Sequence, residues 1–243
     1  MTDAWTLLQQ RRRSSPGLPV VTHVDGRDGT RTELSAVSLE NAAAKIANAL
    51  RDEFDLDAGA VVGLRLPVHW QRAAWCAGAW TAGCAIDVRS DDVDLLVAGP
   101  REATGLDGSF GMRIAVVSLH PLGLPVAGDL PPGVEDVTLA VRQQPDAYLF
   151  DPPSGSDPAL RESGRTMSQA EVLERAGLLA SQWGLTPGGR LLADERAPDG
   201  WLAALAVPLA ADAAVVLASN VTDVERLATQ ERITARAVSA GLR

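Results

Sequence analysis

The chain has 243 residues, of which 46% are hydrophobic and 22% are charged, so it can bury a large core as one domain or as two smaller units. Acidic residues outnumber basic residues by 31 to 22, which gives a net charge of −9 at pH 7. A nucleic-acid-binding protein usually carries a basic surface that neutralises phosphates, so this charge balance excludes nucleic acid as an expected partner.

The sequence predicts neither a membrane span nor a redox or metal site built on cysteine. The longest apolar run, residues 201–218, is interrupted by Pro208 and Asp212, whereas a bilayer-spanning helix needs about 20 apolar residues with few charges. Cys76 and Cys84 match neither the spacing of a metal site nor that of a redox pair, so we expect two buried, inert thiols. Two cysteines and the lack of a recognisable signal peptide predict a cytoplasmic protein without a membrane partner.

The N-terminal region is predicted to contain a helix followed by a hairpin. Residues 1–13 are expected to form a short helix with Leu7 and Leu8 facing inward. Residues 20–24 and 31–34 flank an Asp/Gly-rich turn, and this pattern predicts a β-hairpin.

The segment 34–88 organises the chain, because a degraded copy of it follows at residues 167–217. In each copy a serine, Ser35 or Ser168, is placed to cap a helix with apolar residues at the same four offsets. A glycine turn, an aliphatic strand, an alanine-rich helix with tryptophan and a second strand follow in the same order. The apolar helix positions are Leu39, Ala43, Ile46 and Leu50 in the first copy and Val172, Ala176, Leu179 and Trp183 in the second. The predicted strands are 61–66 and 85–88 in the first copy and 190–193 and 213–217 in the second. The matching order predicts an internal repeat.

Between the two copies the chain adds strands and then a connection. Residues 94–98 and 113–117 are predicted strands, and strands separated by helices indicate a parallel, doubly wound sheet. The Pro/Gly-rich residues 120–133 are interpreted as the connection between two half-domains, residues 1–130 and 131–243, which together form one compact unit.

The second half is expected to begin with a helix at residues 136–143 and a first strand at residues 147–151. The tail, residues 223–242, has apolar residues at roughly helical spacing and predicts one or two surface helices. The expected class is therefore α/β, with two pseudo-repeated, doubly wound half-domains whose largely parallel sheets are flanked by helices.

Two groups of residues are interpreted as structural. Residues 105–111 are glycine-rich but lack the spacing and the following helix of a dinucleotide-binding fingerprint, which favours a surface loop. The three histidines, His23, His69 and His120, lie in hairpin or loop contexts without metal-ligand spacing, which favours ordinary surface or capping roles.

The loop at residues 151–157 is the candidate binding site, because it follows a predicted strand and contains small residues whose N–H groups could cradle a phosphate. These small residues are Ser154, Gly155 and Ser156. The prolines of the loop lack an N–H, and Asp151 and Asp157 would repel a polyphosphate unless a metal ion intervened. Two interpretations stay open: a structural or vestigial loop, or a retained site for a small anion or a nucleotide.

Several short motifs, taken in order, resemble the AMP-binding (adenylate-forming) superfamily, which includes the acyl-CoA synthetases. In the first half they are Leu34-Ser35, Ala58-Gly59, Leu66-Pro67 and Ala82-Gly83. In the second half Asp146 to Leu149 resembles the strand entering the family's phosphate loop, and Leu185 to Gly188 resembles the turn after the next helix. The resemblance covers residues 20–218 and is greatest to short actinobacterial proteins that look like a truncated N-terminal part of such enzymes. It implies an acetyl-CoA synthetase-like fold.

The same resemblance implies a dismantled reaction site. The family's phosphate loop ends in a lysine, but none follows Ser156, and the segment matched to the family's Pro-x-x-His motif, Arg196 to Gly200, has no histidine. Lys45, the only lysine, is predicted on an early helix far from the loop. The 243 residues do not extend to the family's magnesium motif, its ribose-binding aspartate or its C-terminal catalytic lysine. No catalytic residue and no cofactor are therefore expected, while ATP, AMP or CoA stay open as ligands.

These observations favour a truncated relative without adenylation activity that acts by binding or assembly. Two alternatives stay open: a nucleotide- or CoA-binding sensor, and an ATP-dependent acid ligase that another subunit completes. A truncated sheet layer would leave an apolar face, so a homodimer or another protein partner is expected.

Overall fold

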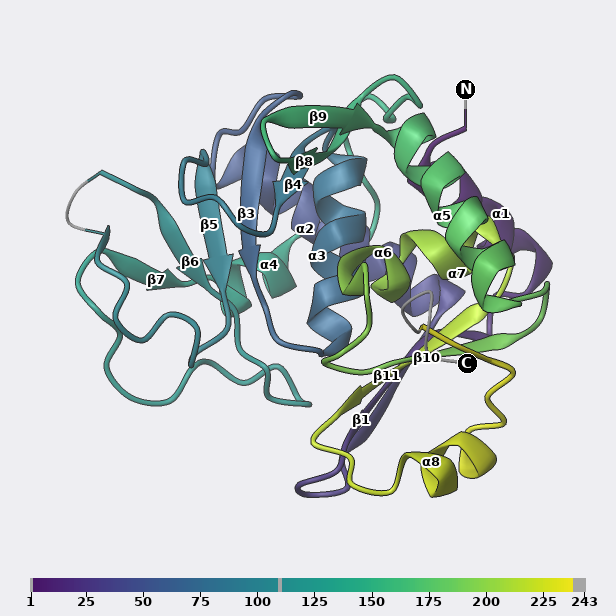
Figure 1. Ribbon diagram of the computed structural model, residues 1–243. Helices are drawn as coiled ribbons and strands as arrows, with labels where there is room; N and C mark the ends of the chain where they lie inside the picture. The colour runs from purple at the N-terminus through teal and green to yellow at the C-terminus, as the bar shows by residue number, and fades with distance from the viewer. Residues whose placement is uncertain (1, 109–110, 238–243) are drawn as a thin grey trace.

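The computed structural model describes residues 2–108 and 111–237, and within them it shows two sheets with helices packed between and around them (Figure 1). The larger sheet has seven strands in the order β7-β6-β5-β3-β4-β8-β9, and the smaller has five in the order β12-β10-β11-β1-β2. Neighbouring strands are parallel except in the hairpins β1-β2 and β8-β9. The predicted α/β class with largely parallel sheets is confirmed.

The strands of the larger sheet are β3 (Val61–Arg65), β4 (Ala85–Asp87), β5 (Leu95–Ala98), β6 (Ile114–Val116), β7 (Val134–Asp136), β8 (Pro158–Glu162) and β9 (Arg165–Ser168). Those of the smaller sheet are β1 (Pro19–Asp25), β2 (Arg31–Ser35), β10 (Arg190–Ala193), β11 (Ala214–Ser219) and β12 (Ala235–Arg236). The helices are α1 (Ala4–Ser14), α2 (Ala36–Asp52), α3 (Trp70–Thr81), α4 (Thr138–Gln143), α5 (Gln169–Trp183), α6 (Gly200–Ala204), α7 (Ala206–Ala210) and α8 (Val224–Gln230).

The two sheets have the same arrangement of three parallel strands followed by a hairpin. In each sheet the hairpin comes from the other part of the chain. In the larger sheet the order β5-β3-β4 continues into the hairpin β8-β9, which precedes α5 in the sequence. In the smaller sheet the order β12-β10-β11 continues into the hairpin β1-β2, which precedes α2. Each sheet therefore holds strands from both sides of residue 130, and the predicted half-domain boundary does not separate the sheets. The boundary and the ancestral duplication stay predictions.

The serine caps form as their spacing predicts. The Ser35 hydroxyl accepts a hydrogen bond from the Ser38 N–H at 3.2 Å and begins α2. Ser168 and Glu171 form a capping box at the start of α5, because the hydroxyl accepts from the Glu171 N–H and the carboxylate accepts from the Ser168 N–H at 2.8 Å. These caps stabilise the starts of two helices whose apolar faces then pack into the core.

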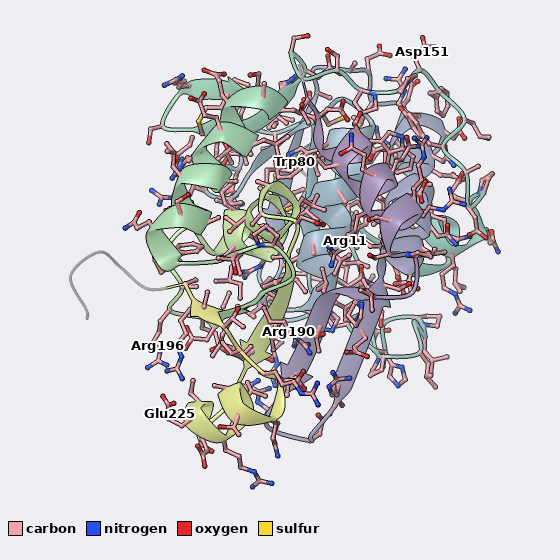
Figure 2. All side chains as sticks on the ribbon, turned by 90° about the vertical axis from the view of Figure 1, so that its right-hand side faces the viewer. Arg11, Trp80, Asp151, Arg190, Arg196 and Glu225 are labelled. Carbon is pink, nitrogen blue, oxygen red and sulfur yellow. The ribbon has the colours of Figure 1, made fainter. Side chains whose placement is uncertain are left out.

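Helix α3 lies between the two sheets, where it contacts β1 of the smaller sheet and β3, β4 and β8 of the larger. Its residues are buried almost all round, including Trp75 and Trp80, as expected of a helix covered on every side. The Trp80 indole N–H donates to the Ala159 carbonyl at 2.7 Å and ties α3 to β8 in the interior of the protein (Figure 2). Gly78 lets α2 pass closely, since a Cβ there would stand 2.4 Å from Ile46 Cγ2.

The opposite faces of the sheets have smaller cores of their own. In β5 and β6 the alternate residues Leu96, Ala98, Ile114 and Val116 form a cluster beneath the loops that follow these strands. In the smaller sheet Leu192, Val216 and Ala218 pack with Leu227 of α8. Because successive strand residues point to opposite faces, both sheets are buried on two sides.

Three details differ from the sequence-based prediction. Residues 147–151 form no strand; instead the Asn48 side chain of α2 binds the backbone of residues 145, 147 and 149 at 2.9–3.2 Å. Asp136 belongs to β7, and the predicted helix starts at Thr138. The tail forms α8 as expected but also β12, and residues 238–243 lie outside the described part.

Candidate functional site: a polar cavity between the two sheets

The carboxyl ends of strands from both sheets meet at one cavity of about 430 Å³. Apart from His23, which lies two residues before the end of β1, every residue of its wall ends or follows β1, β3, β5, β6, β10 or β11. Open α/β sheets place ligands at the carboxyl ends of their strands, so this cavity occupies a position typical of a binding site. The wall consists of His23, Asp25, Arg27, Asp28, Thr30, Pro67, Val68, His69, Arg72, Arg101, Glu102, Leu119, Pro121, Glu195, Ser219 and Asn220.

Two buried histidines form the floor of this site. The rings of His23 (3% exposed) and His69 (7% exposed) contact each other edge to face, with centroids 4.4 Å apart. His69 Nδ1 accepts from the Gln71 N–H at 3.2 Å and caps α3, while His23 Nε2 lies 2.9 Å from the Ser219 hydroxyl. Burial lowers the pKa of His69 to about 3 and also lowers the pKa of His23, so both rings are neutral at pH 7.

The sequence favoured an ordinary surface or capping role for each histidine. His69 does cap α3, but His23 is buried against it, and the sequence did not predict this pair. His23 lies 46 positions from His69 in the chain, and only the packing of α3 against β1 brings the two rings together. The usable signal was positional: His69 follows Leu66-Pro67 at the end of a predicted strand, where parallel sheets hold functional side chains. His120 is exposed, as predicted.

Three residues of the cavity wall, His23, Arg72 and Glu102, each have a buried side-chain atom without a hydrogen-bond partner among the described residues; in His23 it is Nδ1. The Arg72 guanidinium stacks over the Trp201 ring at 4.4 Å and donates through Nη2 to the Leu66 carbonyl at 2.9 Å, while its Nε has no hydrogen-bond partner. Glu102 Oε2 likewise has no partner. Burial lowers the pKa of Arg72 to about 10, against the raising effect of Cys76, Glu102 and Glu195, so the guanidinium stays charged at pH 7. A buried polar atom without a partner costs about 1–3 kcal/mol.

The remaining carboxylates of the wall are already bound by N–H donors. Asp25 accepts from the Asn220 side-chain amide at 3.0 Å, and Glu195 accepts from the Asn220 backbone N–H at 3.0 Å. Asp28 accepts from the Thr30 N–H at 2.8 Å. The wall therefore presents three guanidinium groups and four carboxylates, of which Glu102 is the one with a buried, unpartnered oxygen.

The predicted phosphate loop lies at the amino ends of the strands of the larger sheet, opposite the end at which the cavity lies. Its Asp157 faces Gly83, two residues before β4, so the loop stands at the amino ends of β4 and β8. The strand that should lead into it is absent, and the turn that does follow a strand is Ser163-Gly164, between β8 and β9. Asp151 and Arg196, which belong to the two segments matched to the family's reaction site, lie at opposite ends of the molecule (Figure 2).

Within that loop three backbone N–H groups, those of Ser154, Ser156 and Asp157, are bound by the loop itself. The Asp157 carboxylate accepts from the Ser154 N–H at 2.8 Å, and the Ser154 hydroxyl accepts from the Ser156 N–H at 3.3 Å. The Gly155 carbonyl accepts from the Ala170 N–H at the start of α5. Ser154, Gly155 and Ser156 thus form a closed turn that begins β8 and braces α5; their role as a vestigial phosphate site stays a prediction.

The single lysine binds the segment before this loop. Lys45 lies on α2 as predicted, but it is not remote from the second half of the chain. Its ammonium donates to the Gln144 carbonyl at 2.6 Å and to the Arg142 carbonyl at 3.1 Å, and it pairs with Asp146 at 3.0 Å. These contacts hold residues 142–146 against α2.

Both cysteines are buried and free, as predicted, and burial raises the pKa of each thiol to about 12. Across residues 2–108 and 111–237, no three side chains of the metal-binding types come together to hold an ion. No helix in the same ranges has the length and apolar character required to span a bilayer.

Solved structures identify the class of fold. The chain superimposes on Brucella canis acyl-CoA synthetase with a TM-score of 0.76 at 18% identity, covering 97% of this chain and 47% of that one. Acetoacetyl-CoA synthetase from Streptomyces lividans gives 0.71 at 16% identity, covering 96% of this chain and 41% of that one. The N-terminal domain of FACL13 from Mycobacterium tuberculosis gives 0.70 at 17% identity, covering 96% and 62%. The chain has the acyl-CoA synthetase fold, as the resemblance implied, and spans about half the length of the first of these proteins.

A curated relative identifies the family. The chain is 36% identical over 226 residues to a TIGR03089 family protein from Mycobacterium tuberculosis, and the match covers 90% of both proteins. The chain belongs to the TIGR03089 family. No protein-family model matches it.

Proposed function

We propose that this chain binds a small molecule in the cavity between the carboxyl ends of its two sheets and does not form acyl adenylates by itself. The proposal is carried by a difference in hydrogen bonding between the two ends of the strands of the larger sheet. At the amino ends of β4 and β8 the Ser154, Ser156 and Asp157 N–H groups are bound within the loop. At the carboxyl ends, buried atoms of the cavity-wall residues have no partner among the described residues.

Adenylation would require cationic groups and Mg²⁺ around the charge that develops on the α-phosphate. In the loop that the resemblance matches to the phosphate site, Asp157 supplies a negative charge and takes the Ser154 N–H. The one lysine is bound to residues 142–146. Each of these features opposes binding of a polyphosphate there.

The test is ATP–pyrophosphate exchange by the purified chain with a panel of carboxylic acids, run beside a complete acyl-CoA synthetase as the positive control. The proposal predicts no exchange above a protein-free blank for any acid. Acid-dependent exchange by the chain alone would contradict it and would favour an acid ligase.

We also propose that the chain assembles with a second copy of itself or with another protein, as the apolar character of its surface favours. Several large apolar side chains are exposed, and three of them lie in α4 and in the loop between β6 and β7. These three are Leu122, Leu124 and Leu139. Arg142 of α4 donates to the Gly123 carbonyl of this loop.

A further inference from the structure

Two residues of opposite charge on the cavity wall each have a buried atom without a hydrogen-bond partner among the described residues: Arg72 Nε and Glu102 Oε2. Arg72 comes from the first turn of α3, just after β3, and Glu102 comes from the turn after β5. Strands β3 and β5 are neighbours, so both side chains reach the same cavity. Buried polar atoms in folded proteins nearly always have partners. A ligand that brings an acceptor to Arg72 and a donor to Glu102 would satisfy both atoms at once.

The surroundings of Glu102 favour a cationic donor. A Cβ at Gly99 would stand 2.4 Å from Glu102 Oε2, and the side chains of Leu119 and Pro67 lie 3.3 Å from the same Cβ position. Glycine thus makes room for the carboxylate beside the apolar side chains of Leu119 and Pro67. Hydrogen bonds between two charged groups are stronger than neutral ones, so an ammonium is the best partner for this oxygen.

The arginine side of the cavity favours an anionic group. Stacking on Trp201 and the bond to the Leu66 carbonyl fix the plane of the Arg72 guanidinium and leave its Nε without a hydrogen-bond partner among the described residues. At the mouth, Arg27 and Arg101 are exposed, and neither forms an ion pair with a carboxylate within the described residues. Guanidinium groups match carboxylates and related anions in geometry as well as in charge.

The overall charge of the wall favours a zwitterion over a ligand with several negative charges. Three guanidinium groups stand against four carboxylates, so a ligand with several negative charges, such as a nucleotide, meets net repulsion. A ligand with one charge of each sign does not. We infer that the cavity binds a small zwitterion, with its anionic group toward Arg72 and Arg101 and its amine toward Glu102. The α-amino acids are the simplest members of this class. This inference rests on the proposed binding function.

The experiment is isothermal titration calorimetry of the whole chain with a panel of L-α-amino acids. Each amino acid is paired with the acid that lacks its amine and the amine that lacks its carboxylate, for example L-alanine with propionate and ethylamine. At least one amino acid should bind about tenfold or more tightly than both of its matched compounds, because each of them loses one charged hydrogen bond.

Variants locate the site. Glu102→Gln should weaken the amino acid by about tenfold or more and leave the affinity for the matched acid nearly unchanged. Arg101→Gln, an exposed substitution, should weaken the amino acid and the acid alike, and it carries the test if Glu102→Gln fails to fold. Glu135→Gln is the matched control, since Glu135 is exposed on β7 and lies outside the cavity wall.

The inference is overturned if no amino acid binds, if the matched acid binds equally well, or if both cavity variants keep full affinity. Binding of ATP, AMP or CoA that Glu102→Gln or Arg101→Gln alters would overturn the zwitterion while the proposed cavity function stands. Pyrophosphate exchange by the chain would instead overturn the proposed function.

Discussion

Replacing His69 with asparagine should remove a large part of the acid sensitivity of the fold. In the folded protein burial lowers the pKa of His69 to about 3, whereas the unfolded chain has the ordinary value of 6.5. Between these two pKa values His69 is protonated in the unfolded chain and neutral in the folded chain. Its full contribution to the free energy of unfolding is therefore present above pH 6.5 and is lost as the pH drops toward 3. The asparagine side chain would keep an acceptor for the Gln71 N–H at the start of α3 but would not titrate.

The magnitude follows from the two pKa values. Each pH unit of uncompensated proton uptake costs about 1.4 kcal/mol, and between pH 7 and pH 5 the unfolded histidine goes from mostly neutral to almost fully protonated. His69 therefore accounts for a loss of about 2 kcal/mol over this interval. For a chain of this size the loss corresponds to a fall in Tm of roughly 4–8 °C.

The assay is urea unfolding at pH 7 and pH 5 for wild type, His69→Asn and His120→Asn. The exposed His120 is the control, and its variant should keep the wild-type difference between the two pH values. Carboxylates with lowered pKa values, such as Glu231, which accepts from Arg31, lose their contribution only below about pH 4.5, outside this window. Equal losses of stability by wild type and His69→Asn would refute the reasoning.

Three further predictions concern packing and assembly. Gly78→Ala should destabilise the protein by about 1–3 kcal/mol, because the new methyl group would clash with Ile46. Gly177→Ala should stabilise it by about 0.5–1 kcal/mol, because a Cβ at this position of α5 meets no other atom. Thermal unfolding of both variants measures the difference, and equal shifts in Tm would contradict the prediction. Trp80→Phe should cost about 1 kcal/mol more than Trp75→Phe in urea unfolding, because the Trp80 indole N–H donates to a strand carbonyl and that of Trp75 has no partner. Light scattering at micromolar concentration should give the mass of a dimer, and a monomer would contradict self-assembly.

Local patterns predicted most of the fold. The capped helices α2 and α5, the hairpin β1-β2 and the strands β3 and β10 all follow from residue spacing that the chain satisfies within a few positions. The exchange of hairpins between sheets was not predictable in this way, because it depends on which distant strands pair.

The failures have physical causes as well. Residues 147–151 have the apolar character of a strand, yet the Asn48 amide binds their backbone, and Leu149 remains 62% exposed. Tertiary contact with a side chain here replaces the neighbouring strand that a β-strand would need. The cavity was missed because its wall is assembled from the ends of six strands, so no local spacing marks it.

We expect ligand binding between the two sheets and not at the Ser154–Asp157 loop. The most direct measurement is one calorimetric titration with the best-binding amino acid, made on wild type, Glu102→Gln and the double variant Ser154→Ala/Ser156→Ala. Binding in the cavity predicts a loss of about tenfold or more in affinity for Glu102→Gln and an unchanged affinity for the double variant. Weaker binding by the loop variant with full binding by Glu102→Gln would contradict it.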